Sequence, residues 1–278
     1  MNLLDAAAQS EPVLYTGAFT ILHTRHVLLP RTPELAAAIE GLYAAFKGYP
    51  LPKDFSGCPC CHSPNDHLQL YSAALRELRP EALYQFAGDA LLVWGDLDGF
   101  RHFLPRIFEI SVLTDDNYFT DRPIVFEKLM HGEWRHWPEP EQKAVQQFLM
   151  TVWRTALEIP PEDLPVTERY YPCDSMEDWL CALAGASGPM SPYLEEWLQA
   201  DSASACWNLA AMITRTGMSY AIPRGINAFW GGHMDQAEEI SAWLRTDGVR
   251  KKLESGIEKC ADEAFAEELM AAWEMVRG

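Results

Sequence analysis

The stretch Cys58-Pro59-Cys60-Cys61-His62 combines the residue types and the spacing best suited to chemistry. It holds three of the seven cysteines of the chain, together with a histidine, within a very short segment. Thiolate sulfur and imidazole nitrogen are ligands that zinc prefers in proteins, and neighbouring thiols can also form a redox-active disulfide. The stretch therefore indicates metal binding or redox chemistry.

Zinc is the most specific of these hypotheses, because structural zinc takes four Cys or His ligands in a tetrahedron. Cys58 and Cys61 are expected to supply two ligands. His62 or His67 is expected to supply a third. Cys60 competes with Cys61, since adjacent residues rarely bind one ion well, and no second C-x-x-C or H-x₃-H pair offers a fourth ligand. We expect zinc, if it binds, to be structural and organised by Cys58 and Cys61.

Three other interpretations of the same cysteines stay open. The simplest is that they are free, buried thiols that pack as small hydrophobic side chains. The C-x-x-C spacing of Cys58 and Cys61 also fits a redox dithiol, although no strand–helix–strand pattern surrounds it. Read with His62, the pattern becomes the C-x-x-C-H of c-type haem attachment, which requires export. The N-terminal residues lack the charged and apolar regions of a signal peptide, which argues against haem.

A second candidate site is the acidic, aromatic segment between Thr114 and Pro123. It lacks the glycine and the distal glutamate of a calcium-binding EF-hand loop. Exposed aromatic side chains framed by carboxylates suit docking onto a basic protein surface, and a plain solvated loop is the alternative. The candidate partner-binding residues are Asp115, Asp116, Tyr118, Phe119 and Asp121.

The charge of the chain bears on its partners. The 278 residues carry a net charge of −18, and the excess of Asp and Glu is spread along the whole sequence. Such a field repels nucleic acid and anionic membranes and attracts basic proteins. No apolar run approaches the length of a membrane span. Cysteines without framework spacing and no signal-peptide pattern favour a reduced, cytoplasmic protein.

The elements that must position these residues are helices, because apolar residues recur at helical spacing in most segments. Helices are expected from Thr32 onward, over 68–78, over 82–94, from Asp96 to Glu109 and from Glu139 to Leu157. Thr32 and Asp96 are N-cap candidates, and Pro105 should kink or divide its helix. Only residues 18–25 could form a short strand. On the Asp96 helix, Arg101, His102 and Glu109 could form a polar site. The simpler alternative is that they lie on the outer face of an amphipathic helix whose arginines pair with carboxylates.

The Pro-rich stretch from Pro160 to Pro172 is the best linker, which divides the chain into regions 1–165 and 166–278, or leaves one continuous domain. In the second region the pattern W-L-x-x-D begins at Trp197 and again at Trp243, 46 residues later. A period of this length is typical of HEAT-like helical pairs. We therefore expect an all-α protein, with an N-terminal helical bundle followed by a HEAT-like, α-solenoid-like part.

Three blocks resemble a group of uncharacterised bacterial helical proteins. They are Cys58-Pro59-Cys60-Cys61, the segment from Gly95 to Arg106, and Trp137 to Glu141. The resemblance spans most of the chain and implies an all-helical fold without a reaction. Acidic cytoplasmic proteins of this kind also look like immunity proteins, which neutralise toxins delivered between competing bacteria.

Other catalytic signatures are missing from the sequence. It contains no H-E-x-x-H, no G-x-S-x-G, no P-loop and no G-x-G-x-x-G pattern. We therefore expect a binding protein, namely an immunity-type inhibitor of a basic, secreted bacterial toxin. The alternative is a zinc-dependent enzyme or a redox protein with its site between Cys58 and His67.

Overall fold

The structure, a computed structural model, describes residues 28–53, 57–58, 60–61, 66–114, 119–160, 176–216, 228–260 and 263–277. In these ranges helix is the only regular secondary structure, which confirms the all-α fold class. No helix among them is both long and apolar enough to cross a membrane. The expected strand over 18–25 lies outside the described residues.

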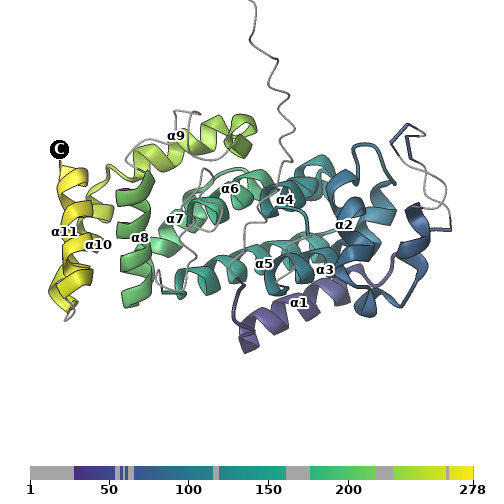
Figure 1. Ribbon diagram of the computed structural model, residues 1–278, viewed down its shortest axis with the longest axis horizontal. Helices are drawn as coiled ribbons and strands as arrows, with labels where there is room; N and C mark the ends of the chain where they lie inside the picture. Colours follow the sequence, from purple (N-terminus) through teal and green to yellow (C-terminus); the bar gives the residue numbers. More distant parts are fainter. Residues whose placement is uncertain are drawn as a thin grey trace, which may run out of the picture.

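The helices follow one another along an elongated molecule, from α1–α4 at one end to α10 and α11 at the other (Figure 1). The first half contains α1 (Pro33–Phe46), the 3₁₀ helices η1 (Asp66–Tyr71) and η2 (Leu75–Glu77), α2 (Pro80–Asp89), α3 (Leu97–Leu113), α4 (Arg122–His131), η3 (Trp134–His136) and α5 (Glu139–Leu157). The second half contains α6 (Met176–Ser187), α7 (Ser191–Gln199), α8 (Ala203–Thr216), η5 (Ala228–Gly232), α9 (Met234–Trp243), α10 (Asp247–Lys259) and α11 (Glu263–Arg277).

Local sequence signals set several helix ends. The Thr32 hydroxyl accepts a hydrogen bond from the Leu35 amide at 3.1 Å, and the Asp96 carboxylate accepts one from the Gly99 amide at 2.8 Å. Each side chain satisfies an amide that the first helical turn leaves without a backbone partner. Both predicted N-caps are confirmed, as is the helix Glu139–Leu157.

Three helix predictions are wrong in detail. Residues 68–78 form the 3₁₀ turns η1 and η2, because the backbone is extended at Ala74. The helix expected over 82–94 ends at Asp89, since Leu91 adopts a positive φ of 65°. Pro105 does not divide α3, which runs unbroken over 17 residues. Burial of Pro105 and its neighbours in the core holds the helix together across the missing amide donor.

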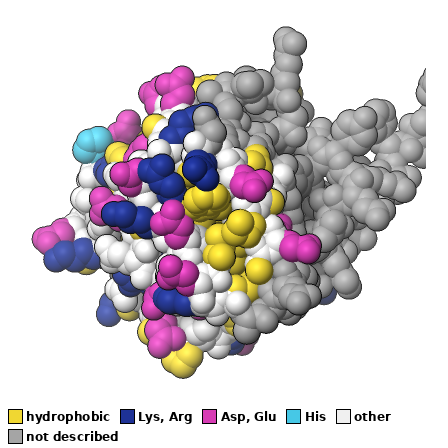
Figure 2. All heavy atoms as spheres, turned by 90° about the vertical axis from the view of Figure 1, so that its left-hand side faces the viewer, with side chains coloured by type: hydrophobic (Ala, Val, Ile, Leu, Met, Phe, Trp, Pro, Cys, Tyr) yellow, Lys and Arg dark blue, Asp and Glu magenta, His cyan; other side chains and the backbone are white. Residues whose placement is uncertain are grey.

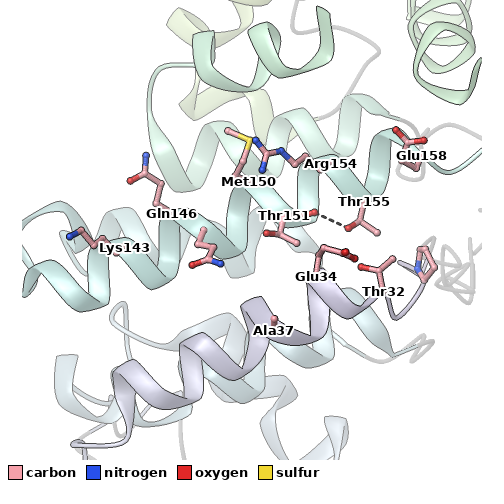
Figure 3. Close-up of a pocket in the computed structure, with 12 residues that line it drawn as sticks. Thr32, Glu34, Ala37, Lys143, Gln146, Met150, Thr151, Arg154, Thr155 and Glu158 are labelled. Carbon is pink, nitrogen blue, oxygen red and sulfur yellow. Dashed lines mark hydrogen bonds between the residues drawn. The ribbon is translucent and has the colours of Figure 1, made fainter. Parts of the chain in front are cut away.

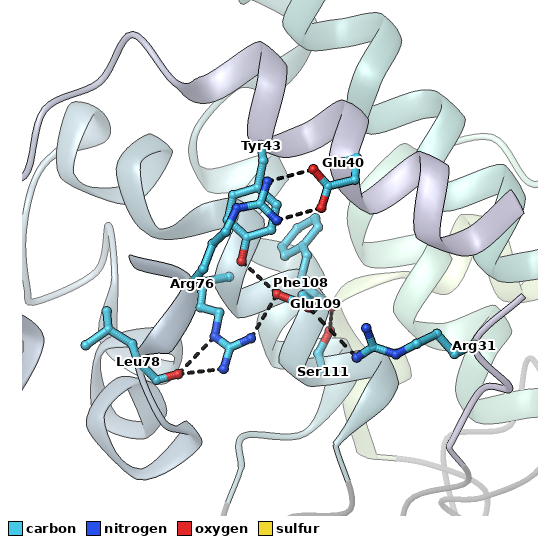
Figure 4. Close-up of polar contacts among 9 residues, drawn as sticks. Arg31, Glu40, Tyr43, Arg76, Leu78, Phe108, Glu109 and Ser111 are labelled. Carbon is cyan, nitrogen blue, oxygen red and sulfur yellow. Dashed lines mark hydrogen bonds and ion pairs between the residues drawn. The ribbon is translucent and has the colours of Figure 1, made fainter. Parts of the chain in front are cut away.

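The outer face of α3 carries paired charges, as the simpler interpretation of that helix expects (Figure 4). Glu109 accepts hydrogen bonds from Tyr43 on α1 at 2.7 Å and from Arg106 at 2.9 Å. Arg106 also donates to the Leu78 carbonyl at 2.8 and 2.9 Å. Arg101 lies 3.5 Å from Glu141 on α5. These contacts join α1, α3, α5 and the chain after η2, so the charges here have a structural role.

The described residues share one apolar core, which reaches from Leu29 to Ala272. Helix α5 links the two halves, since it packs against α1 on one side and against α6, α7 and α8 on the other. The predicted boundary at 165/166 lies outside the described residues and stays a prediction.

The W-L-x-x-D pattern occupies equivalent places in two successive helix pairs. Trp197 lies at the end of α7 before α8, and Trp243 ends α9 before α10. Their rings stack with centroids 5.5 Å apart, which joins the two pairs through the repeated residue itself. Two pairs do not establish a solenoid, so the HEAT-like arrangement stays a prediction.

Candidate metal centre

The cysteine loop is attached to the core by the residues that follow α2. Gly57 forms an isolated antiparallel bridge with Trp94, and the Cys58 amide donates to the Val93 carbonyl at 2.9 Å. Trp94 is buried and meets the Phe86 ring edge-on at 5.4 Å. The first cysteine therefore sits at a position fixed by buried aromatic side chains, although its loop lies on the surface.

The turn that receives the loop is tight and strained. The Asp89 carbonyl accepts hydrogen bonds from the amides of Leu92, Val93 and Trp94 at 3.1–3.2 Å. This geometry requires the positive φ of 65° at Leu91, which is costly for a side chain of that size. It also leaves Leu92 and Val93 exposed, at 57% and 37%. Backbone strain and exposed apolar side chains both concentrate at functional sites, and here they lie beside the cysteines.

The three sulfur atoms converge on one another. The Sγ atoms of Cys58, Cys60 and Cys61 all lie within 4.8 Å, the one such Cys, His, Asp or Glu cluster among the described residues. Sγ of Cys60 is 2.6 Å from that of Cys58 and 3.7 Å from that of Cys61. The Cys61 amide closes the turn by donating to the Cys58 carbonyl at 2.9 Å. Cys60 and Cys61 are exposed, so the interpretation of these thiols as buried hydrophobes is wrong.

The contacts within the cluster shift the pKa values of Cys58 and Cys61 in opposite directions. The hydrogen bond with Cys60 is the main cause that lowers the pKa of Cys58. Hydrogen bonding with Cys60 and then with Cys58 raises the pKa of Cys61 to about 11. A thiolate, the form that binds metals and attacks disulfides, is therefore favoured first at Cys58.

The sulfur spacing can be compared with a metal site. Two sulfurs bound to one tetrahedral zinc, each about 2.3 Å from the metal, lie about 3.8 Å apart. The Cys60–Cys61 pair has this spacing already, whereas Cys58 and Cys60 would have to separate. Cys60, expected to compete with Cys61, instead joins it in one cluster. The arrangement can hold a soft metal ion through three thiolates.

The predicted histidine ligands are not part of this cluster as described. His67 is half-buried and packs edge-on against the Tyr71 ring at 5.9 Å. It is not in the group formed by the three sulfurs. His62 lies outside the described residues.

The predicted docking residues fall into two groups. Asp115, Asp116 and Tyr118 lie outside the described residues. Phe119 is 7% exposed and belongs to the core, so the expectation that it is an exposed anchor is wrong. Its neighbourhood at the start of α4 buries it, and burial also raises the pKa of Asp121, the N-cap residue of that helix.

A buried acidic pair at the start of α6 is a further site, which the sequence does not predict. Asp178 lies 3.4 Å from Arg122, whose guanidinium covers the Trp179 ring at 4.2 Å. Glu177 is fully buried and accepts a hydrogen bond from the Trp230 indole, while its Oε2 has no hydrogen-bond partner among the described residues. Burial raises the pKa of Glu177 to about 8. Acidic residues in a first helical turn are common, so nothing local in the sequence marks this pair as buried.

An open groove of about 850 Å³ runs between α1 and α5 (Figure 3). It is lined by polar and long side chains from the start of α1 and from one face of α5. Its two cations are already paired, Lys143 with Glu139 at 2.6 Å and Arg154 with Glu196 at 2.7 Å. The groove therefore offers a less distinctive chemistry than the cysteine cluster.

Comparisons with protein-family models, curated proteins and solved structures give no match for this chain. The resemblance to bacterial helical proteins and to immunity proteins therefore stays a prediction.

Proposed function

We propose that this is a metal-binding protein whose loop residues Cys58, Cys60 and Cys61 hold one zinc ion. The observation that carries the proposal is the convergence of three sulfur atoms within 4.8 Å on one surface turn. Thiolates are strong zinc ligands, and three of them leave one position of a tetrahedron for another group. Water, a partner side chain or His62, which follows Cys61 in the sequence, would fill that position.

The exposure of the cluster supports a zinc ion that exchanges or contacts a partner. Closed structural sites surround the metal with four protein ligands, whereas sites that act on other molecules keep a position open. Cys60 and Cys61 face solvent, and the exposed side chains of Leu92 and Val93 lie on the turn that binds the loop. A partner that approaches this end of the molecule would meet the metal and the apolar side chains together.

Metal analysis of protein purified without a histidine tag tests the proposal. We expect about one equivalent of zinc per chain, lost after Cys58→Ser, Cys60→Ser or Cys61→Ser, because each change removes one thiolate. Cys260→Ser is the matched control, since Cys260 caps α10 and lies outside the cluster. His62→Ala and His67→Ala decide whether a histidine contributes. Zinc below about a tenth of an equivalent in the unchanged protein would exclude the site.

A second candidate function is inhibition of a basic, secreted toxin by a cytoplasmic immunity-type protein. The net charge of −18 supports it, since opposite charge accelerates association and orients the partner. The face that bears α10 and α11 carries charges of both signs around an apolar patch (Figure 2), so a uniformly acidic docking surface would have to lie elsewhere. Co-expression with a toxin encoded beside this chain tests the idea. Equal killing with and without the protein would end it.

A further inference from the structure

The two sulfur pairs of the cysteine loop differ in their spacing. Cys60 and Cys61 lie 3.7 Å apart, close to the separation of about 3.8 Å for two thiolates on one zinc. Cys58 and Cys60 lie only 2.6 Å apart. Two sulfur atoms that are not bonded cannot stay this close, so this pair must either separate, by about 1.2 Å for a shared tetrahedral zinc, or form a disulfide bond of about 2.05 Å. The same three thiols therefore offer two alternative bonding arrangements.

Access and anchoring favour the reaction of these thiols with a small disulfide. Cys60 is exposed and Cys58 half-buried, so a soluble reagent can reach the pair from solvent. The Cys58 backbone is fixed by its hydrogen bond to Val93, and the Cys61 amide bonds back to the Cys58 carbonyl. These bonds hold the turn on which both cysteines lie. The remaining cysteines that the structure describes, Cys181, Cys206 and Cys260, are buried or half-buried.

We infer that Cys58 and Cys60 form a reversible disulfide by exchange with a small disulfide of the glutathione type, and that closing it releases the metal. The second half of this inference rests on the proposed zinc site. Disulfide sulfur is a poor zinc ligand, because the thiolate is the form that binds metals. Closure therefore removes two of the three ligands and leaves Cys61 alone.

The exchange proceeds in two balanced steps. The Cys58 thiolate attacks one sulfur of glutathione disulfide, a Cys58–glutathione bond forms, and one glutathione thiolate leaves. The Cys60 thiolate then attacks the Cys58 sulfur, the Cys58–Cys60 bond forms, and the second glutathione leaves. Two protein thiols lose two electrons, one glutathione disulfide gains them, and the two thiol protons end on the two glutathione molecules.

The test begins with reduced, zinc-free protein treated with glutathione disulfide, alkylated and digested with trypsin. All three cysteines fall in one peptide, from Asp54 to Arg76. We expect this peptide to lose two hydrogens and to carry one alkyl group, on Cys61. Cys61→Ser should still close the bridge, whereas Cys58→Ser and Cys60→Ser should not, and the control Cys260→Ser should behave like the unchanged protein. A bridge to Cys61, a disulfide between chains or a stable glutathione adduct would overturn the inference.

A second arm adds zinc before the oxidant. With free zinc at about a hundredfold excess over its dissociation constant, about 1% of sites are empty, so closure should slow about a hundredfold. Zinc that binds the oxidised protein as tightly as the reduced protein would overturn the release of metal. Failure of the reduced protein to bind zinc would instead contradict the proposed function, because the bridge itself is measured in zinc-free protein.

Discussion

Glu177 shows at the residue scale how burial changes the behaviour of a common side chain. Burial raises its pKa from the ordinary 4.5 to about 8, Asp178 adds to the rise, and the Trp230 indole opposes it. The folded protein therefore keeps the proton up to about pH 8, whereas the unfolded chain releases it near pH 4.5. Since the folded state binds the extra proton, the free energy of unfolding contributed by this group falls as the pH rises through that window.

The variant Glu177→Gln tests this assignment. Glutamine has a similar shape, can still accept from the Trp230 indole and does not ionise, so the pH dependence should weaken. We expect the variant to exceed the unchanged protein in unfolding free energy by on the order of 4 kcal/mol near pH 9, and to match it near pH 4.5. Urea unfolding at the two pH values measures both. Glu238→Gln, at an exposed position of α9, is the control, and an equal response of the two variants would refute the role of burial.

The cysteine cluster shows what could be predicted for single residues. Three thiols in four positions can be recognised from the sequence alone, and they do converge in the structure. Their exposure could not be predicted, because it depends on the contacts of Gly57 and Cys58 with Trp94 and Val93, more than thirty positions away. For the same reason the sequence could not show that Phe119 is buried.

Among the helices, the two tryptophans that begin the W-L-x-x-D patterns make different contacts. Trp197 is fully buried, donates its indole hydrogen to the Ala205 carbonyl at 2.9 Å and meets the Trp153 ring at 5.2 Å. Trp243 is 9% exposed, and its indole nitrogen has no hydrogen-bond partner among the described residues. A buried donor without a partner destabilises the folded state, so the two residues should respond differently to one substitution.

The matched variants Trp197→Phe and Trp243→Phe test this difference. Trp197→Phe loses a hydrogen bond and buried area, and should lower the unfolding free energy by about 2–3 kcal/mol. Trp243→Phe loses area but also removes the unpaired donor, and should cost less than about 1 kcal/mol. Urea unfolding gives the comparison, with the unfolding free energy falling equally steeply with urea concentration in both variants. A larger loss from Trp243→Phe would contradict the assigned contacts.

Sequence signals were most reliable for elements with local causes. The caps Thr32 and Asp96 act within one turn, so both were predictable. The end of α2 could not be predicted in this way. Its apolar periodicity continues through Leu91, whereas the backbone turns there to meet the cysteine loop. The local preference of proline predicts a break at Pro105, but tertiary packing maintains α3 across it.

The part of the whole molecule that the structure describes shares one core, and its unfolding should reflect that. Helix α5 packs against helices of both halves, so neither half can lose its core without exposing the other. We expect a single thermal transition, with a ratio of calorimetric to van't Hoff enthalpy of about 1. Two resolved transitions in scanning calorimetry would instead favour separate regions 1–165 and 166–278.

X-ray absorption at the zinc edge, on protein loaded with one equivalent of zinc, measures the ligands of the proposed site. We expect a first shell of three sulfurs at about 2.3 Å with one lighter atom at about 2.0–2.1 Å. Cys260→Ser should leave the sulfur number at three, because Cys260 lies outside the cluster. A shell made only of oxygen and nitrogen would contradict the three-thiolate site.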